Sequence, residues 1–262
     1  MHLELKQTIR TRGLVPFLLT GILTLTGCRA EKPYEVLETK GHDPSLFTQG
    51  LIVEGNDLIE SSGGYGNSKL IRYNAETGKL LNSAPLPKTV FAEGIHQLDN
   101  SIVLLTWREN RAYRLDADTF LIRQVFPLET EGWGLTHDSR NFIQSDGSDQ
   151  LYFRNSSTFK IEKTITVRDA GEPQDRLNEL EFAKGLIWAN IYTTPMIVAI
   201  EPNSGEVVFT LDLSELTAKH HSNAPGYELN GIAYDPARDA FWVTGKRWNK
   251  RYLIKIHVKN DL

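Results

Sequence analysis

The sequence predicts an all-β protein, a five-bladed β-propeller closed by an N-terminal strand. A short motif recurs along the chain: a polar or aromatic residue, then Gly (once Glu), then Leu or Ile. Successive copies begin 44, 40, 45 and 52 residues apart, which is the repeat length of four-stranded propeller blades. The first residues of the five copies are Gln49, Glu93, Trp133, Asn178 and Asn230.

The composition agrees with this fold class. Of the 262 residues, 40% are apolar, and Phe, Tyr and Trp number 11, 9 and 5. This is enough apolar surface for one large core or a ring of small ones. Apolar and aromatic runs with short polar breaks favour strands over helices. The formal charge is −4, and because no basic stripe is present, nucleic acid is not expected as a partner.

Each motif copy opens a set of short predicted strands separated by turn-forming residues such as Gly55-Asn56 and Asp99-Asn100. The first four sets have four strands each, and the fifth has three. In chain order the predicted strands are 34–40, then 51–53, 57–61, 69–74, 79–82, then 94–98, 101–107, 111–115, 121–126, then 134–136, 141–145, 151–154, 159–167, then 180–182, 186–192, 196–200, 206–211, and finally 231–234, 240–244, 252–258.

The strand at 34–40 has no hairpin partner nearby, and the fifth blade lacks an outer strand. Pairing these two segments would close the ring and hide both open sheet edges. Two long polar connections, 168–177 and 213–229, precede inner strands. The second is expected to hold a helical turn at 213–219. Connections of this length often serve a site.

If each motif begins an inner strand, its first residue faces one rim of the central channel. Glu93 is then the single acid of this ring, close to the aromatic Phe91. Burial beside an aromatic ring raises the pKa of a carboxyl group toward neutrality, which suits proton transfer. The alternative is a structural carboxylate paired with Lys246 that only ties blades together. Lys246 would otherwise be an ordinary surface lysine.

The remaining ring residues suggest a pocket. Gln49, Asn178 and Asn230 offer hydrogen-bonding groups suited to an amide or an oxyanion, although channel hydrogen bonds would explain them equally well. The five tryptophans divide by strand position. Those inside strands are expected in the core, and those at strand ends are expected either as pocket walls or in core or rim packing. The first group is Trp188 and Trp242, and the second is Trp107, Trp133 and Trp248.

No metal or cofactor is expected. Cysteine occurs once, and His42, His96 and His137 are scattered without metal-ligand spacing. The chain also lacks nucleotide-binding and serine-hydrolase signatures.

The N-terminal segment resembles a lipoprotein signal. Basic residues precede an apolar run over 14–25, and Leu25-Thr-Gly-Cys28 fits the bacterial lipobox. The run is shorter than the ~20 residues of a membrane-spanning helix. We therefore expect a signal peptide over 1–27, a lipidated tether over 28–33 and the propeller domain over 34–262. The lipid on Cys28 would anchor the protein in the bacterial envelope, facing the periplasm, with the outer membrane preferred because Arg29 rather than Asp follows. The alternative is a plain membrane anchor with an incidental cysteine.

Ordered motifs across nearly all of the mature chain resemble the plant and bacterial glutaminyl-peptide cyclotransferases. They include Phe47-Thr-Gln-Gly-Leu51, Phe91-Ala-Glu-Gly-Ile95, Leu105-Thr-Trp107, Glu131-Gly-Trp-Gly-Leu-Thr136, Ser145-Asp-Gly-Ser148, Leu177-Asn-Glu-Leu-Glu181 and Val243-Thr-Gly-Lys246.

The resemblance implies a zinc-independent propeller transferase that converts an N-terminal glutamine to pyroglutamate and releases ammonia. The family's acid/base residue corresponds to Glu93, and one family pocket tryptophan corresponds to Tyr192. The resemblance places the rest of the pocket at Phe47, Gln49, Phe91, Trp107, Trp133, Asn178 and Lys246.

We hypothesise that Glu93 relays a proton from the attacking amine to the leaving nitrogen, while Asn178, Gln49 or Lys246 stabilises the oxyanion. The expected partners are peptides or proteins with N-terminal glutamine, and the chain is expected to be a monomer. Two alternatives remain: a non-catalytic periplasmic propeller that binds proteins, and a metal-dependent propeller hydrolase, for which Glu93 is the only charged ligand in the ring.

Overall fold

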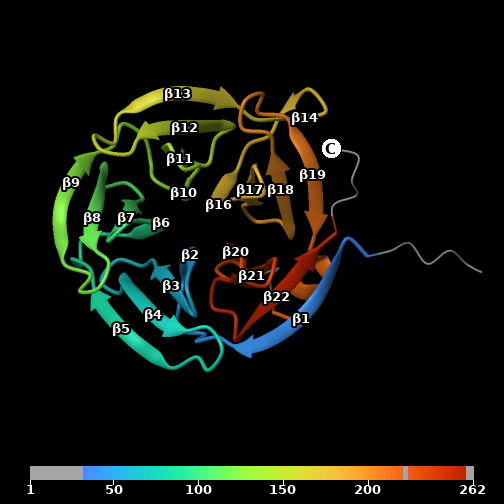
Figure 1. The fold of residues 1–262 in the computed structure, drawn as a ribbon, viewed down its shortest axis with the longest axis horizontal. Coiled ribbons are helices and arrows are strands. Elements are labelled where there is room, and N and C mark those ends of the chain that lie inside the picture. Colours follow the sequence, from blue (N-terminus) through green and yellow to red (C-terminus); the bar gives the residue numbers. More distant parts are fainter. Residues whose placement is uncertain (1–31, 221–223, 258–262) are drawn as a thin grey trace, which may run out of the picture. The chain divides into compact units, whose positions relative to one another are not determined.

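The computed structural model describes residues 32–220 and 224–257. From Lys32 onward, these residues form five four-stranded antiparallel sheets arranged radially around a central axis (Figure 1). The predicted five-bladed propeller is therefore confirmed. Cys28 and the proposed signal peptide lie outside the described residues.

The blades follow one another along the chain, with the inner strand first in each. Blade one contains β2 (Thr48–Glu54), β3 (Asp57–Ser62), β4 (Lys69–Asn74) and β5 (Leu80–Pro85). Blade two contains β6 (Ala92–Leu98), β7 (Ser101–Thr106), β8 (Arg111–Asp116) and β9 (Ile122–Pro127). Blade three contains β10 (Leu135–His137), β11 (Asn141–Ser145), β12 (Gln150–Asn155) and β13 (Ile161–Thr166). Blade four contains β16 (Leu177–Ala183), β17 (Leu186–Ile191), β18 (Met196–Ile200) and β19 (Val207–Asp212). Blade five contains β20 (Leu229–Asp235), β21 (Ala240–Gly245), β22 (Lys250–Ile256) and, as its outer strand, β1 (Tyr34–Gly41).

The two long connections differ in content. The first contains a small hairpin that the sequence did not predict, β14 (Arg168–Asp169) and β15 (Glu172–Pro173). The second contains the expected helical turn, α1 (Ser214–Thr217). Among the described residues, no helix has the length and apolarity needed to cross a membrane.

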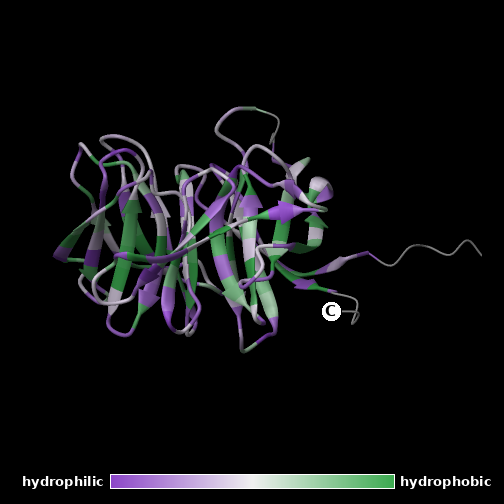
Figure 2. Cartoon of the chain, turned by 90° about the horizontal axis from the view of Figure 1, so that it is seen from above, coloured by the Kyte–Doolittle hydropathy of each residue, from purple (hydrophilic) through white to green (hydrophobic). Residues whose placement is uncertain are grey.

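The core is divided among the blade interfaces. Five clusters of buried apolar side chains occur in the described residues, and each joins two neighbouring blades. Between blades one and two, for example, Ile59 packs in the same cluster as Ile95 and Leu104. The side view agrees, with green apolar positions along the strands and purple polar positions mainly in the loops (Figure 2). Because each sheet covers its neighbours, burial depends on the ring being complete.

Arginines in the third strand of several blades link each blade to the next. Arg72 donates to the carbonyl of Ala117 at 3.2 Å, and Arg114 donates to that of Ser156 at 2.6 Å. Arg251 repeats this contact between blades five and one, where its Nη2 donates to Ala75 O at 2.6 Å and its Nη1 donates to Gly41 O.

The first and last strands of the described chain, β1 and β22, lie side by side in blade five (Figure 1). There β1 pairs antiparallel with β22, with Tyr34 opposite Ile256 and Gly41 opposite Lys250. Behind this seam His42 is buried, with Nδ1 2.8 Å from Trp248 O and Nε2 3.1 Å from Glu60 Oε2. Glu60 also accepts hydrogen bonds from the hydroxyls of Thr48 and Tyr73, at 2.7 and 3.0 Å. A buried polar network thus links blade five to blade one next to the pairing of β1 with β22.

Candidate active site

The recurring motif corresponds to a bulge in the inner strand. In four blades the register between the first two strands shifts at the motif: between Thr48 and Gly50, Ala92 and Ile95, Leu177 and Leu180, and Leu229 and Ile232. A bulged residue is released from the regular pairing and its side chain is redirected. In blade three the motif precedes β10, and Trp133 N donates to Ser145 O at 3.1 Å.

Glycine in the second motif position lets neighbouring inner strands approach closely. A Cβ on Gly94 would lie 2.5 Å from Trp133 O, and one on Gly134 would lie 2.0 Å from Asn178 O. In blade four Glu179 takes this position. Its buried carboxylate accepts the backbone N–H groups of Leu51 at 3.2 Å and Ile232 at 2.7 Å, which belong to blades one and five. Burial raises the pKa of Glu179 well above its ordinary value.

The side chains directed toward one rim form a cavity of about 290 Å³. It is lined by Phe47, Gln49, Phe91, Glu93, Trp107, Trp133, Asn178, Tyr192 and Lys246. These are the nine residues that the sequence predicted for the catalytic and substrate-binding groups, so the structure brings all of them together.

Two other residues singled out from the sequence, Asn230 and Trp248, do not line this cavity. Asn230 lies behind the pocket, where its Nδ2 donates to Gln49 Oε1 at 3.2 Å and to Thr48 O at 3.0 Å. Trp248 follows the second of its two alternatives, because it packs in the core and does not line the pocket. Its side chain is 1% exposed, stacks on His220 at 4.1 Å and packs directly over Gly245. Trp188 and Trp242 are buried in the core as predicted.

Glu93 lies deep in the pocket, with 6% of its surface exposed. Gln49 Nε2 approaches Glu93 Oε1 at 3.4 Å, and Ser61 Oγ donates to the backbone carbonyl of Glu93 at 2.6 Å. Burial raises the pKa of Glu93 well above its ordinary value; the Lys246 charge opposes this effect, and the charges of Glu109 and Glu131 add to it. A carboxyl group with a raised pKa is suited to accept a proton and release it again.

Lys246 is buried rather than a surface lysine, with 4% of its surface exposed. Its ammonium lies 5.0 Å from the ring centroid of Phe47 and 4.7 Å from that of Tyr192. Burial lowers the pKa of Lys246, and the carboxylates of Glu93 and Glu228 partly offset this. No ion pair within 4.0 Å joins Lys246 to Glu93 among the described residues, so the structural pairing considered from the sequence is not formed directly.

The aromatic walls meet edge to face. Phe91 contacts Phe47 and Trp107 at centroid distances of 6.2 and 5.4 Å, and Trp133 contacts Tyr192 at 5.5 Å. This geometry is favourable for aromatic pairs and keeps ring faces available to a ligand.

Two glycines lie in close contact with two of these aromatic rings. A Cβ on Gly63 would lie 2.3 Å from a ring carbon of Phe91, and one on Gly147 would lie 2.6 Å from the Trp133 indole. The segments Ser61-Ser-Gly-Gly64 and Ser145-Asp-Gly-Ser148 read as turns in the sequence. The sequence did not predict that glycines in these turns pack against pocket aromatic rings, because the local sequence does not show which ring will contact a glycine.

The sequence also did not predict that Glu131 contributes to the structure of the pocket. Its side chain does not line the cavity, yet it contacts two of the pocket tryptophans. The signal was present in the sequence, since Glu131 opens the motif that contains Trp133.

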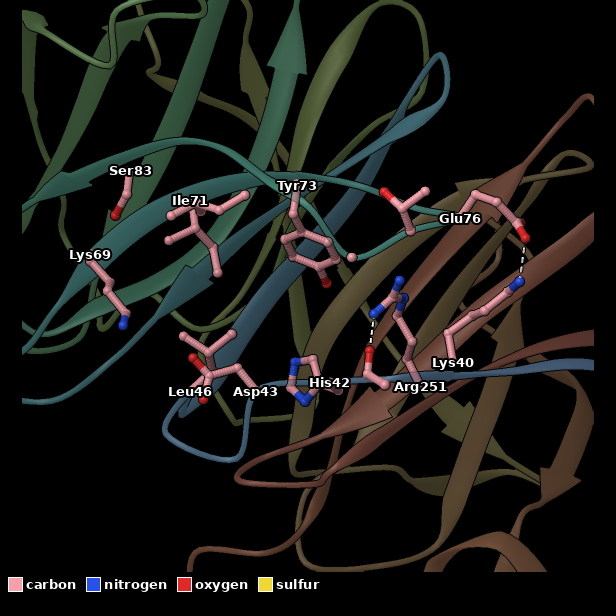
Figure 3. A pocket seen from close by; sticks show the side chains of 14 residues that line it. Lys40, His42, Asp43, Leu46, Lys69, Ile71, Tyr73, Glu76, Ser83 and Arg251 are labelled. Carbon is pink, nitrogen blue, oxygen red and sulfur yellow. Dashed lines mark hydrogen bonds and ion pairs between the residues drawn. The ribbon is translucent and has the colours of Figure 1, made fainter.

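A second, larger cavity of about 460 Å³ lies at the seam between blades five and one, away from the motif residues. Its walls include Lys40, His42, Tyr73, Glu76 and Arg251 (Figure 3). Arg251 donates to Gly41 O, and a dashed contact joins Lys40 to Glu76 (Figure 3), so these groups are engaged in contacts that involve β1. Within residues 32–220 and 224–257, no three His, Cys, Asp or Glu side chains are grouped to hold a metal ion.

Comparisons with known proteins agree with this geometry. Residues 17–256 match the family model described as glutamine cyclotransferase. The chain is 35% identical over 228 residues to a glutaminyl-peptide cyclotransferase of Arabidopsis thaliana, covering 85% of this chain and 71% of that protein. It is also similar to the crystal structure of Myxococcus xanthus glutaminyl cyclase, with a TM-score of 0.80, 28% identity, and coverage of 87% of this chain and 97% of that one.

Proposed function

Because the chain belongs to the glutamine cyclotransferase family, we propose that its propeller pocket cyclises the N-terminal glutamine of peptides and proteins to pyroglutamate. The observation that carries the assignment of roles is a buried carboxyl, Glu93, with a raised pKa inside an aromatic cavity. The cavity is of a size to take one glutamine side chain and its α-amine, while the rest of a peptide extends over the rim.

The reaction joins the α-amine nitrogen to the side-chain amide carbon and breaks the bond from that carbon to the amide nitrogen, which leaves as ammonia. An α-amine has a pKa of about 8, so a reactive neutral fraction exists near neutrality. Glu93, as carboxylate, accepts the proton that the amine loses on attack and then gives it to the departing nitrogen. The carboxylate is regenerated, so protons balance without a co-reactant.

The surrounding side chains favour ring closure. The indoles of Trp107 and Trp133 and the Phe91 ring hold the glutamine curled, which lowers the entropic cost of forming a five-membered ring. They also exclude water that would hydrolyse the amide. The oxygen that becomes negative would be stabilised by the ammonium of Lys246 or by the amides of Asn178 and Gln49.

Ammonia release from a Gln-initiated peptide tests the function and the role of Glu93 together. Wild-type protein should release one ammonia per pyroglutamate formed, and Glu93→Gln should lower kcat by at least about 100-fold, in line with the loss of general acid–base catalysis. Gln is nearly isosteric with Glu, so binding should persist. Comparable turnover by both proteins would remove Glu93 from this role, and no product from wild type would remove the function.

We also propose that the reaction needs no metal and is an aminoacyl transfer. The described residues offer protein groups for each proton transfer, which supports this view. Activity should survive dialysis against a strong chelator, and loss of activity that a divalent cation restores would contradict it.

We further propose that β1 closes the ring and that the protein acts as a monomer. We also propose that residues 1–27 are removed and that lipid on Cys28 then anchors the protein in the bacterial envelope, facing the periplasm. The pairing of β1 with β22 supports closure, and the lipobox supports anchoring. Mass spectrometry of the N-terminal peptide from the producing bacterium should detect acyl chains on Cys28. If Cys28→Ser leaves the protein as firmly bound to membranes as wild type, the lipid anchor is wrong.

A further inference from the structure

Two pocket walls share one hydrogen-bond acceptor outside the cavity. The indole N–H of Trp107 donates to Glu131 Oε2 at 2.8 Å, and that of Trp133 donates to the same oxygen at 3.0 Å. Trp107 follows β7 in blade two, whereas Trp133 precedes β10 in blade three. One carboxylate oxygen therefore couples walls that belong to different blades.

The carboxylate is itself held in place. Arg108 Nε donates to Glu131 Oε1 at 3.1 Å, and the Arg108 guanidinium stacks 3.8 Å from the centre of the Trp107 ring. The backbone carbonyl of Glu131 accepts from Gln144 Nε2 at 2.9 Å. Arg154, which is buried, donates in turn to Gln144 Oε1 at 2.6 Å. Both ends of Glu131 are thus fixed.

The indole of Trp133 is also confined on two other sides. A Cβ on Gly147 would lie 2.6 Å from the Trp133 indole, so the backbone there limits how far that ring can retreat. On its other side Trp133 meets Tyr192 edge to face. The hydrogen bond to Glu131 limits rotation of the Trp133 ring about its side-chain torsions, because an indole N–H donates in one direction only.

We propose that Glu131 is a positioning residue, which orients the indoles of Trp107 and Trp133 against the bound glutamine by accepting both N–H groups. The inference rests on the proposed function, since the walls matter only if a substrate lies between them. Glu131 acts through the tryptophans and does not contact the reacting atoms. A carboxylate is suited to this task because its oxygen carries more than one lone pair and forms stronger hydrogen bonds than a neutral acceptor.

Substitution of Glu131 tests the proposal. Glu131→Ala should lower kcat/KM by about 10- to 100-fold, since a misplacement of about 1 Å costs up to that much. Glu131→Gln keeps a side-chain oxygen that can accept both indole N–H groups, so it should retain most of the wild-type kcat/KM. In ¹⁵N NMR spectra the indole N–H signals of Trp107 and Trp133 should move in Glu131→Ala and stay near their wild-type positions in Glu131→Gln.

A double-mutant cycle separates positioning from a general loss of structure. Trp107→Phe with Trp133→Phe keeps two aromatic walls but removes both N–H donors. In that background Glu131→Ala should have little further effect on kcat/KM, because the contacts it removes are already absent. If Glu131→Ala costs as much there as in wild type, or leaves kcat/KM of wild type within about twofold, the positioning role is wrong.

Glu109→Gln is the control for the loss of negative charge that accompanies substitution of Glu131. Glu109 and Glu131 both raise the pKa of Glu93, whereas the indole N–H groups donate to Glu131. Both Gln variants should move the acid limb of the pH profile to lower pH, and neither should move the indole signals. If wild-type protein releases no ammonia, the proposed function fails on its own, and unshifted indole signals in Glu131→Ala overturn the positioning role independently.

Discussion

Lys246 and Glu93 influence each other across the pocket without a direct ion pair. Burial disfavours the charged form of each group, and the opposite charge of the partner partly restores it. The pocket therefore contains a carboxyl that holds its proton more tightly and an ammonium that holds its proton less tightly than the same groups in water. Groups with such shifted pKa values are characteristic of catalytic sites.

Removing the Lys246 charge should shift the pH dependence of activity. In Lys246→Met the carboxylate of Glu93 loses its stabilising positive neighbour, so the pKa of Glu93 rises further. Because the reaction requires Glu93 as carboxylate, the acid limb of kcat/KM should move to higher pH, with a lower maximum. Steady-state assays across pH would measure this, with the exposed Lys79→Met as control. An unmoved acid limb would show that Lys246 does not act on Glu93.

At the scale of elements, the inner-strand bulges and the arginine links have different structural roles. The bulges turn motif residues toward the pocket, while the arginines connect the outer part of each blade to the next. Arg251 repeats this link between blades five and one, beside the pairing of β1 with β22, and it is 2% exposed. Its guanidinium satisfies carbonyls of both Gly41 and Ala75.

Arg251→Met should therefore destabilise the protein more than Arg114→Met. Each hydrogen bond from a charged group contributes about 1.5–3 kcal/mol, and Arg251→Met removes bonds to two carbonyls at the closing interface. We expect a loss of about 3 kcal/mol or more in the free energy of unfolding, measured by urea denaturation. Arg114→Met, which removes a bond to one carbonyl between blades two and three, should cost less; equal losses would contradict a special role of Arg251.

At the scale of the whole molecule, buried polar contacts between blades contribute to stability. The buried pair of His42 and Glu60 joins the connection after β1 to strand β3 of blade one. Burial lowers the pKa of His42, but the Glu60 carboxylate and the Trp248 carbonyl raise it more, so the net pKa is above the ordinary value. Burial alone would raise the pKa of Glu60, yet His42, Thr48 and Tyr73 bring it below its ordinary value.

The sign of the pH effect follows from linkage. The contribution of His42 is fully present below its unfolded pKa of about 6.5 and is lost as pH rises through the raised folded pKa. The contribution of Glu60 is present above its unfolded pKa of about 4.3 and is lost as pH falls through the lowered folded pKa. The pair therefore stabilises the ring most between these limits.

His42→Gln should remove this window. The difference in unfolding free energy between wild type and His42→Gln should be largest near pH 5–6 and should shrink at alkaline pH, where the wild-type imidazole is neutral. Urea denaturation at several pH values would measure the difference. His257→Gln, which replaces an imidazole at an exposed position, is the matched control substitution. A difference that is constant with pH would mean that folding does not change the pKa of His42.

The sequence alone determined the number of blades, the order of the strands and the membership of the pocket. Repeat length and strand alternation are local properties that the chain displays directly, and the five motif copies mark the same structural position in each blade. The nine pocket residues, among them Glu93 and Lys246, came from these motifs together with the family resemblance they carry, and the cavity contains all nine.

Only the tertiary structure decided which of these side chains touch. Trp248 was open between a pocket wall and core packing, and it packs over Gly245. Glu131 was known only as the start of a motif, and it joins Trp107 to Trp133. The hairpin of β14 and β15 was likewise not apparent. Such contacts depend on bulge geometry and on the packing of one blade against the next, which bring together residues far apart in sequence that no local pattern relates.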